Sequence, residues 1–499
     1  MSEAPAHAAQ AAAERPPAPH YEPTLASVRT HPVPDWYEDA KLGIFIHWSL
    51  SSVPGFAQRE LDIRDVMRTR HRDMAPLSPY AEWYENAAKF PWSPAAKYHR
   101  ETYGDRPYHA FQADWEAALA QWRPDEWARL FRKTGARYVV LVTKHHDGYC
   151  LWPTAVANPH RPGFASARDV VGELAAAVRA EGMRFGVYYS GGLDWTFNPT
   201  PIRSAGDMVA SVPGGDYPDY ADRHVRELIE RYEPAVLWND IAWPTSRARL
   251  WSLFADYYDA VPDGVVNDRW LTLLGLGRIL RFTPLRAVFD WLYARTIRGG
   301  GGALEPPLPP HCDARTPEYT VYPEAREKKW ECVRGMDRSF GFNRTSVESD
   351  FLSREDLVRS FVDIVSKNGN LLLNVGPRGE DAQIPEPQLR RLEWLGAWLE
   401  RNGEAIYGTR PWKRAEGRTS DGLSVRFTSR GRDLFALVFG TPAGPEVVLQ
   451  DVAVPPGTVV EWLGVGPVAA RADGGSVHVA RPDGLGDDPV HAIALRGGA

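Results

Sequence analysis

Short, continuous apolar runs recur along the first four-fifths of the chain, and each ends in polar or aromatic residues. The runs cover residues 42–46, 138–143, 184–189, 235–238, 264–266 and 369–373. Uninterrupted apolar runs of this length are typical of strands that are buried on both faces, as in a parallel sheet. We therefore expect a parallel sheet at the centre of a large domain.

Amphipathic stretches with helical spacing alternate with these runs. Residues 124–131, 168–179 and 220–232 each precede one of the runs. Strands that alternate with helices predict βα units. We expect an α/β fold, a (β/α)8-like TIM barrel over residues 21–408, whose chemistry lies at the carboxyl ends of its strands.

The two ends of the chain have other patterns. Residues 1–20 are rich in Ala and Pro, which predicts a disordered tail. After residue 408, short strands at 423–427, 434–439 and 446–449 stand between turn residues. This alternation favours a small antiparallel β-sandwich domain over residues 409–499.

Composition narrows the classes of function. The chain has 499 residues and a formal net charge of −6, so it lacks the basic footprint of a nucleic-acid-binding protein. Its 57 aromatic residues (19 Trp, 20 Tyr, 18 Phe) fit either a sugar-binding site or a large aromatic core. Three cysteines without a CxxC spacing argue against a disulfide framework and a structural zinc site.

Two further features concern location. The N-terminal residues do not show a basic segment followed by an apolar one, so we do not expect a secretory signal. Apolar runs stay well below the roughly 20 residues of a membrane span, so we do not expect membrane association either. A cytoplasmic protein is the resulting expectation.

Chemically active side chains stand where a scaffold would need only turn residues. His47, His145, His146, Asp240 and Arg269 all lie within three residues of the end of an apolar run. Taken alone, Asp240 could be a helix cap or a turn residue. The histidines could ligate a metal or be buried with backbone partners.

These strand ends resemble the α-L-fucosidase family of retaining glycoside hydrolases, glycoside hydrolase family 29. The matching segments are residues 41–48 (KLGIFIHW), 82–84 (EWY), 144–152 (KHHDGYCLW), 186–190 (GVYYS), 237–240 (LWND), 266–270 (VNDRW), 370–377 (NLLLNVGP) and 403–408 (GEAIYG). They occur in the family's order over residues 30–410. This resemblance implies an exo-acting enzyme that hydrolyses terminal α-L-fucosides through a covalent fucosyl-enzyme.

The resemblance also implies roles for two carboxylates. Asp240 matches the family's nucleophile, and Glu318, in the segment 316–319 (TPEY), matches the acid/base. Retaining enzymes hold such a pair about 5–5.5 Å apart across the scissile bond. An inserted segment before Glu318 leaves four nearby carboxylates as alternatives for the acid/base: Asp290, Glu305, Asp313 and Glu324.

A pocket for L-fucose needs polar side chains for the ring hydroxyls and an apolar wall for the C5 methyl. The resemblance assigns this role to His47, Glu82, Trp83, His145, His146, Tyr189, Trp238, Arg269 and Phe340. It implies no metal and no other cofactor, and residues 374–377 look like a structural turn. The partner we expect is a fucosylated oligosaccharide or glycoconjugate.

Two other functions fit the same residues. One is the same machinery acting on a related sugar such as an α-L-galactoside, because one hydroxyl discriminates weakly in an apolar pocket. The other is a non-catalytic sugar-binding protein, since a fold does not fix a function. Turnover of a glycoside separates the second from the first.

Residues 271–312 form a connection that is longer than in the relatives. The segment is apolar with interspersed arginines, has a helical pattern over 285–297, and continues into four glycines and a Pro-rich stretch. Our hypothesis is that it packs beside the mouth of the active site and restricts the aglycone. A subunit contact in a homo-oligomer and a helix on a membrane surface are the alternatives.

Overall fold

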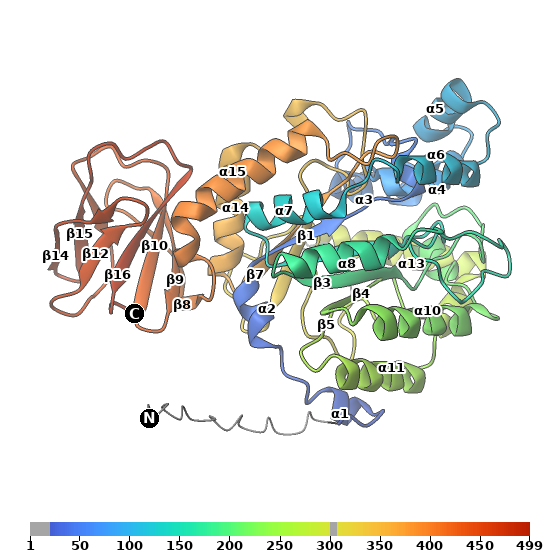
Figure 1. Ribbon diagram of the computed structural model, residues 1–499, viewed down its shortest axis with the longest axis horizontal. Coiled ribbons are helices and arrows are strands. Elements are labelled where there is room, and N and C mark those ends of the chain that lie inside the picture. The colour runs from blue at the N-terminus through green and yellow to red at the C-terminus, as the bar shows by residue number, and fades with distance from the viewer. Residues whose placement is uncertain (1–19, 300–306) are drawn as a thin grey trace, which may run out of the picture.

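The computed structural model describes residues 20–299 and 307–499. The expected disordered tail therefore lies, except for residue 20, outside the described residues. The described chain has a barrel-like α/β region, and strands of antiparallel sheets follow it (Figure 1). In this part of the chain, no helix has the length and apolar character needed to cross a membrane.

A curled parallel sheet forms the centre of the α/β region. Among the described residues its strands follow the order β5-β4-β3-β2-β1-β7-β6, and every neighbouring pair is parallel. The strands are β1 (Leu42–Ile46), β2 (Tyr138–Lys144), β3 (Arg184–Ser190), β4 (Val236–Asp240), β5 (Val265–Val266), β6 (Trp330–Gly335) and β7 (Gly369–Val375). The predicted TIM-like barrel is confirmed.

The gap between the two edge strands is filled by the segment 313–318. The backbone of Asp313 donates to Val266 of β5 over 3.0 Å, and Val266 donates to the Asp313 carboxylate over 2.8 Å. Glu318 pairs with Val333 of β6 in a parallel bridge. This irregular strand therefore occupies the eighth position of the barrel and ends at Glu318.

Helices cover the outside of the sheet (Figure 1). They include α7 (Pro124–Thr134), α8 (Val170–Ala180), α10 (Tyr217–Tyr232), α11 (Arg247–Ala260), α14 (Arg354–Ser366) and α15 (Glu386–Asn402). Helix α7 illustrates how local sequence sets the bounds, since it begins with Pro124 and is followed by Gly135 in the left-handed conformation. The main core lies between sheet and helices, and a second cluster around Phe45, Tyr188 and Trp238 fills the barrel interior.

Shorter helices surround the carboxyl ends of the strands and the N-terminal approach to the barrel. They are α1 (Leu25–Val28), α2 (Asp35–Ala40), α3 (Ile63–Thr69), α4 (Tyr84–Ala88), α5 (Pro94–Tyr103), α6 (Phe111–Ala118) and α9 (Ala205–Ala210). The long connection of residues 271–312 adds α12 (Leu274–Leu280) and α13 (Thr283–Gly299). Both of these helices pack on α9, and α13 also contacts α3.

The C-terminal strands begin at Arg410 and form two antiparallel sheets. Within the described residues, one sheet has the order β13-β12-β16-β10-β9-β8 and the other β11-β15-β14. The strands are β8 (Arg410–Arg418), β9 (Ser424–Arg430), β10 (Asp433–Phe439), β11 (Glu446–Leu449), β12 (Val459–Trp462), β13 (Gly466–Pro467), β14 (Ala470–Asp473), β15 (Ser476–Ala480) and β16 (Val490–Arg496). Helices α14 and α15 lie between the barrel and these strands (Figure 1).

Candidate active site

Asp240 is the last residue of β4 and lies at the carboxyl end of the barrel. One carboxylate oxygen accepts from the hydroxyl of Tyr188 over 2.8 Å. The other accepts from Nη1 of Arg269 over 2.9 Å and from the backbone amide of Ile241 over 2.8 Å. The Asp240 side chain is 13% exposed, so its charge is oriented by three donors and can still be reached from outside.

Arg269 connects this carboxylate to Glu318. Its Nη2 donates to Oε1 of Glu318 over 2.6 Å, and the Glu318 side chain is 18% exposed. Burial alone would lower the pKa of Arg269, but the nearby carboxylates of Glu318 and Asp240 outweigh that effect and raise it. The two carboxylates therefore lie side by side on one permanently charged guanidinium.

The residue after each carboxylate has an unusual backbone. Ile241 has a φ of 67° and Tyr319 a φ of 49°, in the left-handed region that β-branched and bulky residues seldom adopt. Such strain persists only where surrounding contacts hold it, and it occurs frequently at functional sites. In this case it turns the chain sharply just after Asp240 and Glu318.

Three histidines line the barrel mouth next to Asp240. Nδ1 of His47 is 2.6 Å from the amide oxygen of Asn374, and Nδ1 of His146 is 2.7 Å from the hydroxyl of Ser190. Burial lowers the pKa of His47 to about 4 and holds the pKa values of His145 and His146 well below their usual range. All three rings are therefore neutral at pH 7 and suit hydrogen bonds to uncharged hydroxyls.

The alternative of a metal site was left open by the sequence. Across residues 20–299 and 307–499, no three His, Cys, Asp or Glu side chains are grouped so that they could hold a metal ion. The Nδ1 atoms of His47 and His146 already face Asn374 and Ser190, which leaves their Nε2 sides for other partners. Nε2 of His146 is 4.0 Å from the Asp240 carboxylate.

Glu82 and Phe340 form a wall of the same mouth next to His47. The Glu82 carboxyl accepts from the backbone amide of Gly341 over 2.7 Å, and burial raises the pKa of Glu82 to about 8. The Phe340 ring is 5.2 Å from the ring of His47. This wall thus combines a carboxyl that keeps its proton at pH 7 with an apolar face.

Two tryptophans complete the predicted set. The Trp83 ring meets the His146 ring edge-on at 5.0 Å. The Trp238 ring stacks on Tyr188 at 5.3 Å, and the guanidinium of Arg269 lies 4.8 Å from the Trp238 ring centre. Both rings therefore lie beside groups that contact or approach Asp240.

Tyr189 does not join this group. Strand β3 alternates, so that Tyr188 shares the interior face with Trp238, whereas Tyr189 packs in the core between sheet and helices. The Tyr189 hydroxyl is 3.2 Å from Nδ1 of His224. The tyrosine at Asp240 is thus Tyr188, one position before the residue assigned by resemblance.

Tyr80 and Asn374 also belong to the site but were not among the predicted residues. The Tyr80 hydroxyl donates to Oε2 of Glu318 over 3.1 Å. Asn374, expected to be a structural turn residue, orients His47 and donates to the backbone oxygen of Phe340 over 2.6 Å. Their strand-end and loop positions gave no signal strong enough to separate them from scaffold residues.

The alternative carboxylates lie elsewhere. Asp290 accepts from Ser204 and from the amide of Gly206, which ties α13 to α9. Asp313 is buried against Tyr258 and Val266, and Glu324 is exposed on the surface. Glu305 lies outside the described residues. Of the described candidates, Glu318 is the one that shares Arg269 with Asp240.

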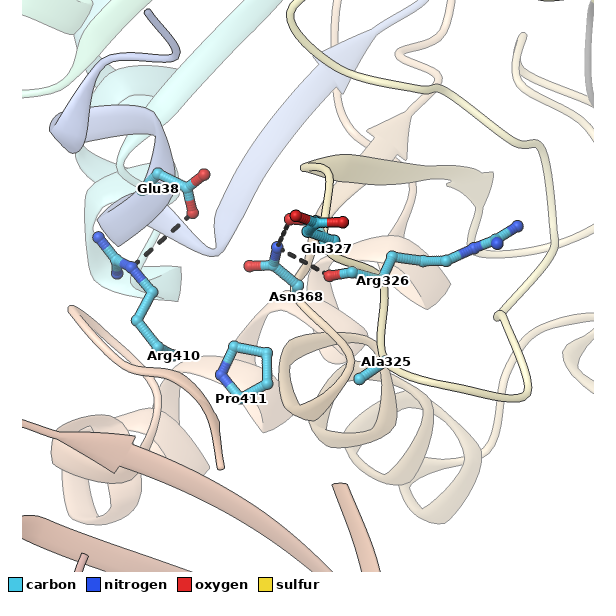
Figure 2. A pocket seen from close by; sticks show the side chains of 7 residues that line it. All are labelled: Glu38, Ala325, Arg326, Glu327, Asn368, Arg410 and Pro411. Atoms are coloured by element: carbon cyan, nitrogen blue, oxygen red, sulfur yellow. Dashed lines mark hydrogen bonds and ion pairs between the residues drawn. The ribbon is translucent and has the colours of Figure 1, made fainter. Parts of the chain in front are cut away.

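An open pocket lies at the other end of the barrel (Figure 2). It is lined by Glu38, Ala325, Arg326, Glu327, Asn368, Arg410 and Pro411. Glu38 and Asn368 precede β1 and β7, so the pocket is at the amino ends of the strands. Chemistry in such barrels occurs at the carboxyl ends, and we do not assign the reaction to this pocket.

A barrel whose carboxyl end presents two carboxylates among neutral polar and aromatic side chains has the layout of a glycoside hydrolase. Comparison with known proteins agrees. The family model described as α-L-fucosidase matches residues 7–276 and 308–404. An α-L-fucosidase from Branchiostoma floridae is 31% identical, and the alignment covers 89% of this chain and 88% of that protein.

Solved structures give the same result. The α-fucosidase of Thermotoga maritima with a mechanism-based inhibitor is 40% identical, with a TM-score of 0.79, and the match covers 95% of this chain and all of that one. Its structure with fucose, also 40% identical, covers the same shares with a TM-score of 0.78. The chain belongs to the α-L-fucosidase family.

Proposed function

We propose that this glycoside hydrolase is an exo-acting α-L-fucosidase that retains the anomeric configuration. The observation that supports this most directly is the pair Asp240 and Glu318 on the guanidinium of Arg269. A nucleophile and an acid must reach one glycosidic bond together, and retaining enzymes keep the two carboxyl groups close for that reason. The fucose complex of the Thermotoga maritima relative supports the choice of sugar.

In the first step, a carboxylate oxygen of Asp240 attacks the anomeric carbon. The bond to the leaving group breaks, and Glu318 gives its proton to the departing oxygen. Tyr188 and Arg269 orient Asp240 for the attack, because both donate to its carboxylate. The product is a fucosyl ester on Asp240.

In the second step, Glu318 takes a proton from water. The water oxygen attacks the anomeric carbon, the ester bond to Asp240 breaks, and L-fucose leaves. The neutral histidines and the protonated Glu82 fit hydroxyls of an uncharged sugar, and the Phe340 ring fits its C5 methyl.

The test uses aryl glycosides with wild type, Asp240→Ala and Glu318→Ala. We expect the wild type to release the phenol from the α-L-fucoside and to form α-L-fucose first, as seen by NMR. Asp240→Ala should lose on the order of 10³-fold or more in kcat. Cleavage of the α-L-galactoside instead would change the sugar but keep the mechanism, and binding without turnover would make the chain a sugar-binding protein.

Added azide separates the two roles. With Glu318→Ala and a good leaving group, azide should accept the sugar from the Asp240 ester and give the α-fucosyl azide. With Asp240→Ala, azide should attack directly and give the β-fucosyl azide. Formation of the β-azide by Glu318→Ala would contradict the assignment.

A further inference from the structure

The inserted helices are an addition to the family's fold. The family match stops at residue 276 and resumes at 308, so most of α12 and all of α13 lie outside it. The pair is nevertheless firmly attached. Asp290 of α13 accepts from the hydroxyl of Ser204 over 2.8 Å and from the amide of Gly206 over 2.7 Å. Arg286 pairs with Asp207 over 3.0 Å.

The inward face of α13 carries two aromatic rings. Phe289 and Tyr293 are nearly parallel, with 8° between their planes and 6.2 Å between their centres. Both rings are partly buried and pack against a cluster that includes Ile63, Val66 and Met67. They form an offset aromatic platform that is anchored on α3 and α9.

This platform adjoins the acid/base. Tyr80 packs against the same cluster and donates to Glu318 over 3.1 Å. Arg64 of α3, on which α13 packs, donates to the Thr320 hydroxyl over 2.8 Å and to the backbone oxygen of Tyr319. Burial and the negative charge of Glu318 raise the pKa of Tyr293 to about 12, as expected of a phenol close to that carboxylate.

The location of the aromatic platform next to Glu318 indicates which part of the substrate it would contact. An acid/base protonates the oxygen between the cleaved sugar and its leaving group, so the leaving group extends past that carboxyl. We propose that Tyr293, with Phe289 beside it, is the wall of a leaving-group subsite that binds a neutral pyranose. The ring faces would pack on the sugar's C–H face, and the Tyr293 hydroxyl would meet its hydroxyls. This inference rests on the proposed function.

The outward face of α13 supplies a matched control. Trp291 is 56% exposed and Val288 is 54% exposed, and both are on the same helix as Tyr293. Trp291→Ala therefore removes an aromatic ring of the same helix without touching the proposed wall.

The experiment compares two kinds of substrate of the same enzyme. α-L-Fucosyl fluoride has no leaving-group sugar, whereas fucosyl disaccharides linked 1→2, 1→3, 1→4 and 1→6 each have one. We expect Tyr293→Ala to lower the ratio of kcat/KM for the best disaccharide to that for the fluoride about 10-fold. Tyr293→Phe should keep most of the ratio, and Trp291→Ala should keep all of it.

The outcomes separate the two proposals. An unchanged ratio in Tyr293→Ala, with native circular dichroism, would overturn the leaving-group subsite. If Tyr293→Ala does not fold, Tyr293→Leu keeps an apolar side chain without the aromatic face and decides the matter by the same ratio. Failure of the wild type to hydrolyse the fluoride would instead reject the proposed function itself.

Discussion

At the scale of single residues, the alternation of β3 decides which tyrosine serves the nucleophile. The Tyr188 hydroxyl donates to Asp240, and hydrogen bonds to charged groups contribute ~1.5–3 kcal/mol. We therefore expect Tyr188→Phe to lower kcat/KM for an aryl α-L-fucoside about 10- to 100-fold, measured by initial rates at pH 7.

Tyr189→Phe is the matched control for this prediction. It removes the neighbouring hydroxyl, which contacts His224 on the helix side of the same strand. Its kcat/KM should stay within about twofold of wild type. A large loss in Tyr189→Phe together with full activity in Tyr188→Phe would reverse the assignment and restore the position implied by resemblance.

Glu82 gives the protein a dependence of stability on pH. Burial raises its pKa to about 8 in the folded chain, above the ordinary value of 4.5. Between these values the folded state holds a proton that the unfolded state releases. Its contribution to the free energy of unfolding is therefore complete below pH 4.5 and is lost as pH rises through about 8.

Glu82→Gln removes this titration while keeping an oxygen that accepts from Gly341. We expect the melting temperature of Glu82→Gln, relative to wild type, to rise between pH 5 and pH 9. Thermal denaturation followed by circular dichroism at both pH values measures it. A constant difference would mean that Glu82 stays ionised in the folded protein.

The success of predicting the site residues differed between the two sources of evidence, the apolar runs and the family resemblance. Asp240, His47 and His146 follow apolar runs, and they do lie together at the barrel mouth. The family resemblance assigned the tyrosine next to Asp240 to Tyr189, because a sequence match gives only the position along the chain. The parallel register of Tyr188 with Trp238, and of Ser190 with Asp240, fixes the face and requires the paired strands.

At the scale of elements, two glycines in α12 behave differently. A Cβ added to Gly277 would lie 2.7 Å from the backbone oxygen of Val209, whereas one added to Gly275 would meet nothing within 4 Å. Gly277→Ala must push α12 away from α9, while Gly275→Ala improves helix propensity by roughly 0.5–1 kcal/mol.

Hydrogen exchange of the α12 and α13 amides measures this difference. We expect faster exchange in Gly277→Ala and equal or slower exchange in Gly275→Ala. If the proposed leaving-group subsite is correct, Gly277→Ala also loses disaccharide activity relative to the fluoride. Unaltered exchange in Gly277→Ala would show that the contact between α12 and α9 is not held in solution.

Elements with mixed composition escaped prediction. The six strands read from apolar runs are confirmed, but β6 contains Glu331 and Arg334 and was not expected. Glu331 is tolerated in the barrel interior because the hydroxyls of Tyr37 and Tyr138 donate to it. The segment 313–318 is likewise polar, and pairing with its neighbours makes it strand-like.

At the scale of the whole molecule, the main hydrophobic core continues from the barrel into the C-terminal strands, which also have a core of their own. Phe435, Leu437 and Ala492 belong to the same cluster as the helices of the barrel. Trp398 of α15 is buried there, and its indole donates to the backbone oxygen of Val490 over 2.8 Å. Lys367 and Glu416 add an ion pair at 2.8 Å.

A shared core predicts cooperative unfolding of both parts. We expect one transition in differential scanning calorimetry. Trp398→Ala should lower the free energy of unfolding by about 3–5 kcal/mol and shift this single peak to a lower temperature. Trp92→Ala is the control, because Trp92 is 52% exposed. Two separate peaks in the wild type would mean that the parts unfold independently.

The double hydrogen bond between Asp313 and Val266 has a consequence for how this fold can diversify. These hydrogen bonds hold the chain on the barrel after the long connection and before Glu318. A change in the length of that connection therefore need not move Glu318. Evolution or protein design can thus replace residues of the connection and change the substrate specificity of the enzyme, while Asp240 and Glu318 keep their positions.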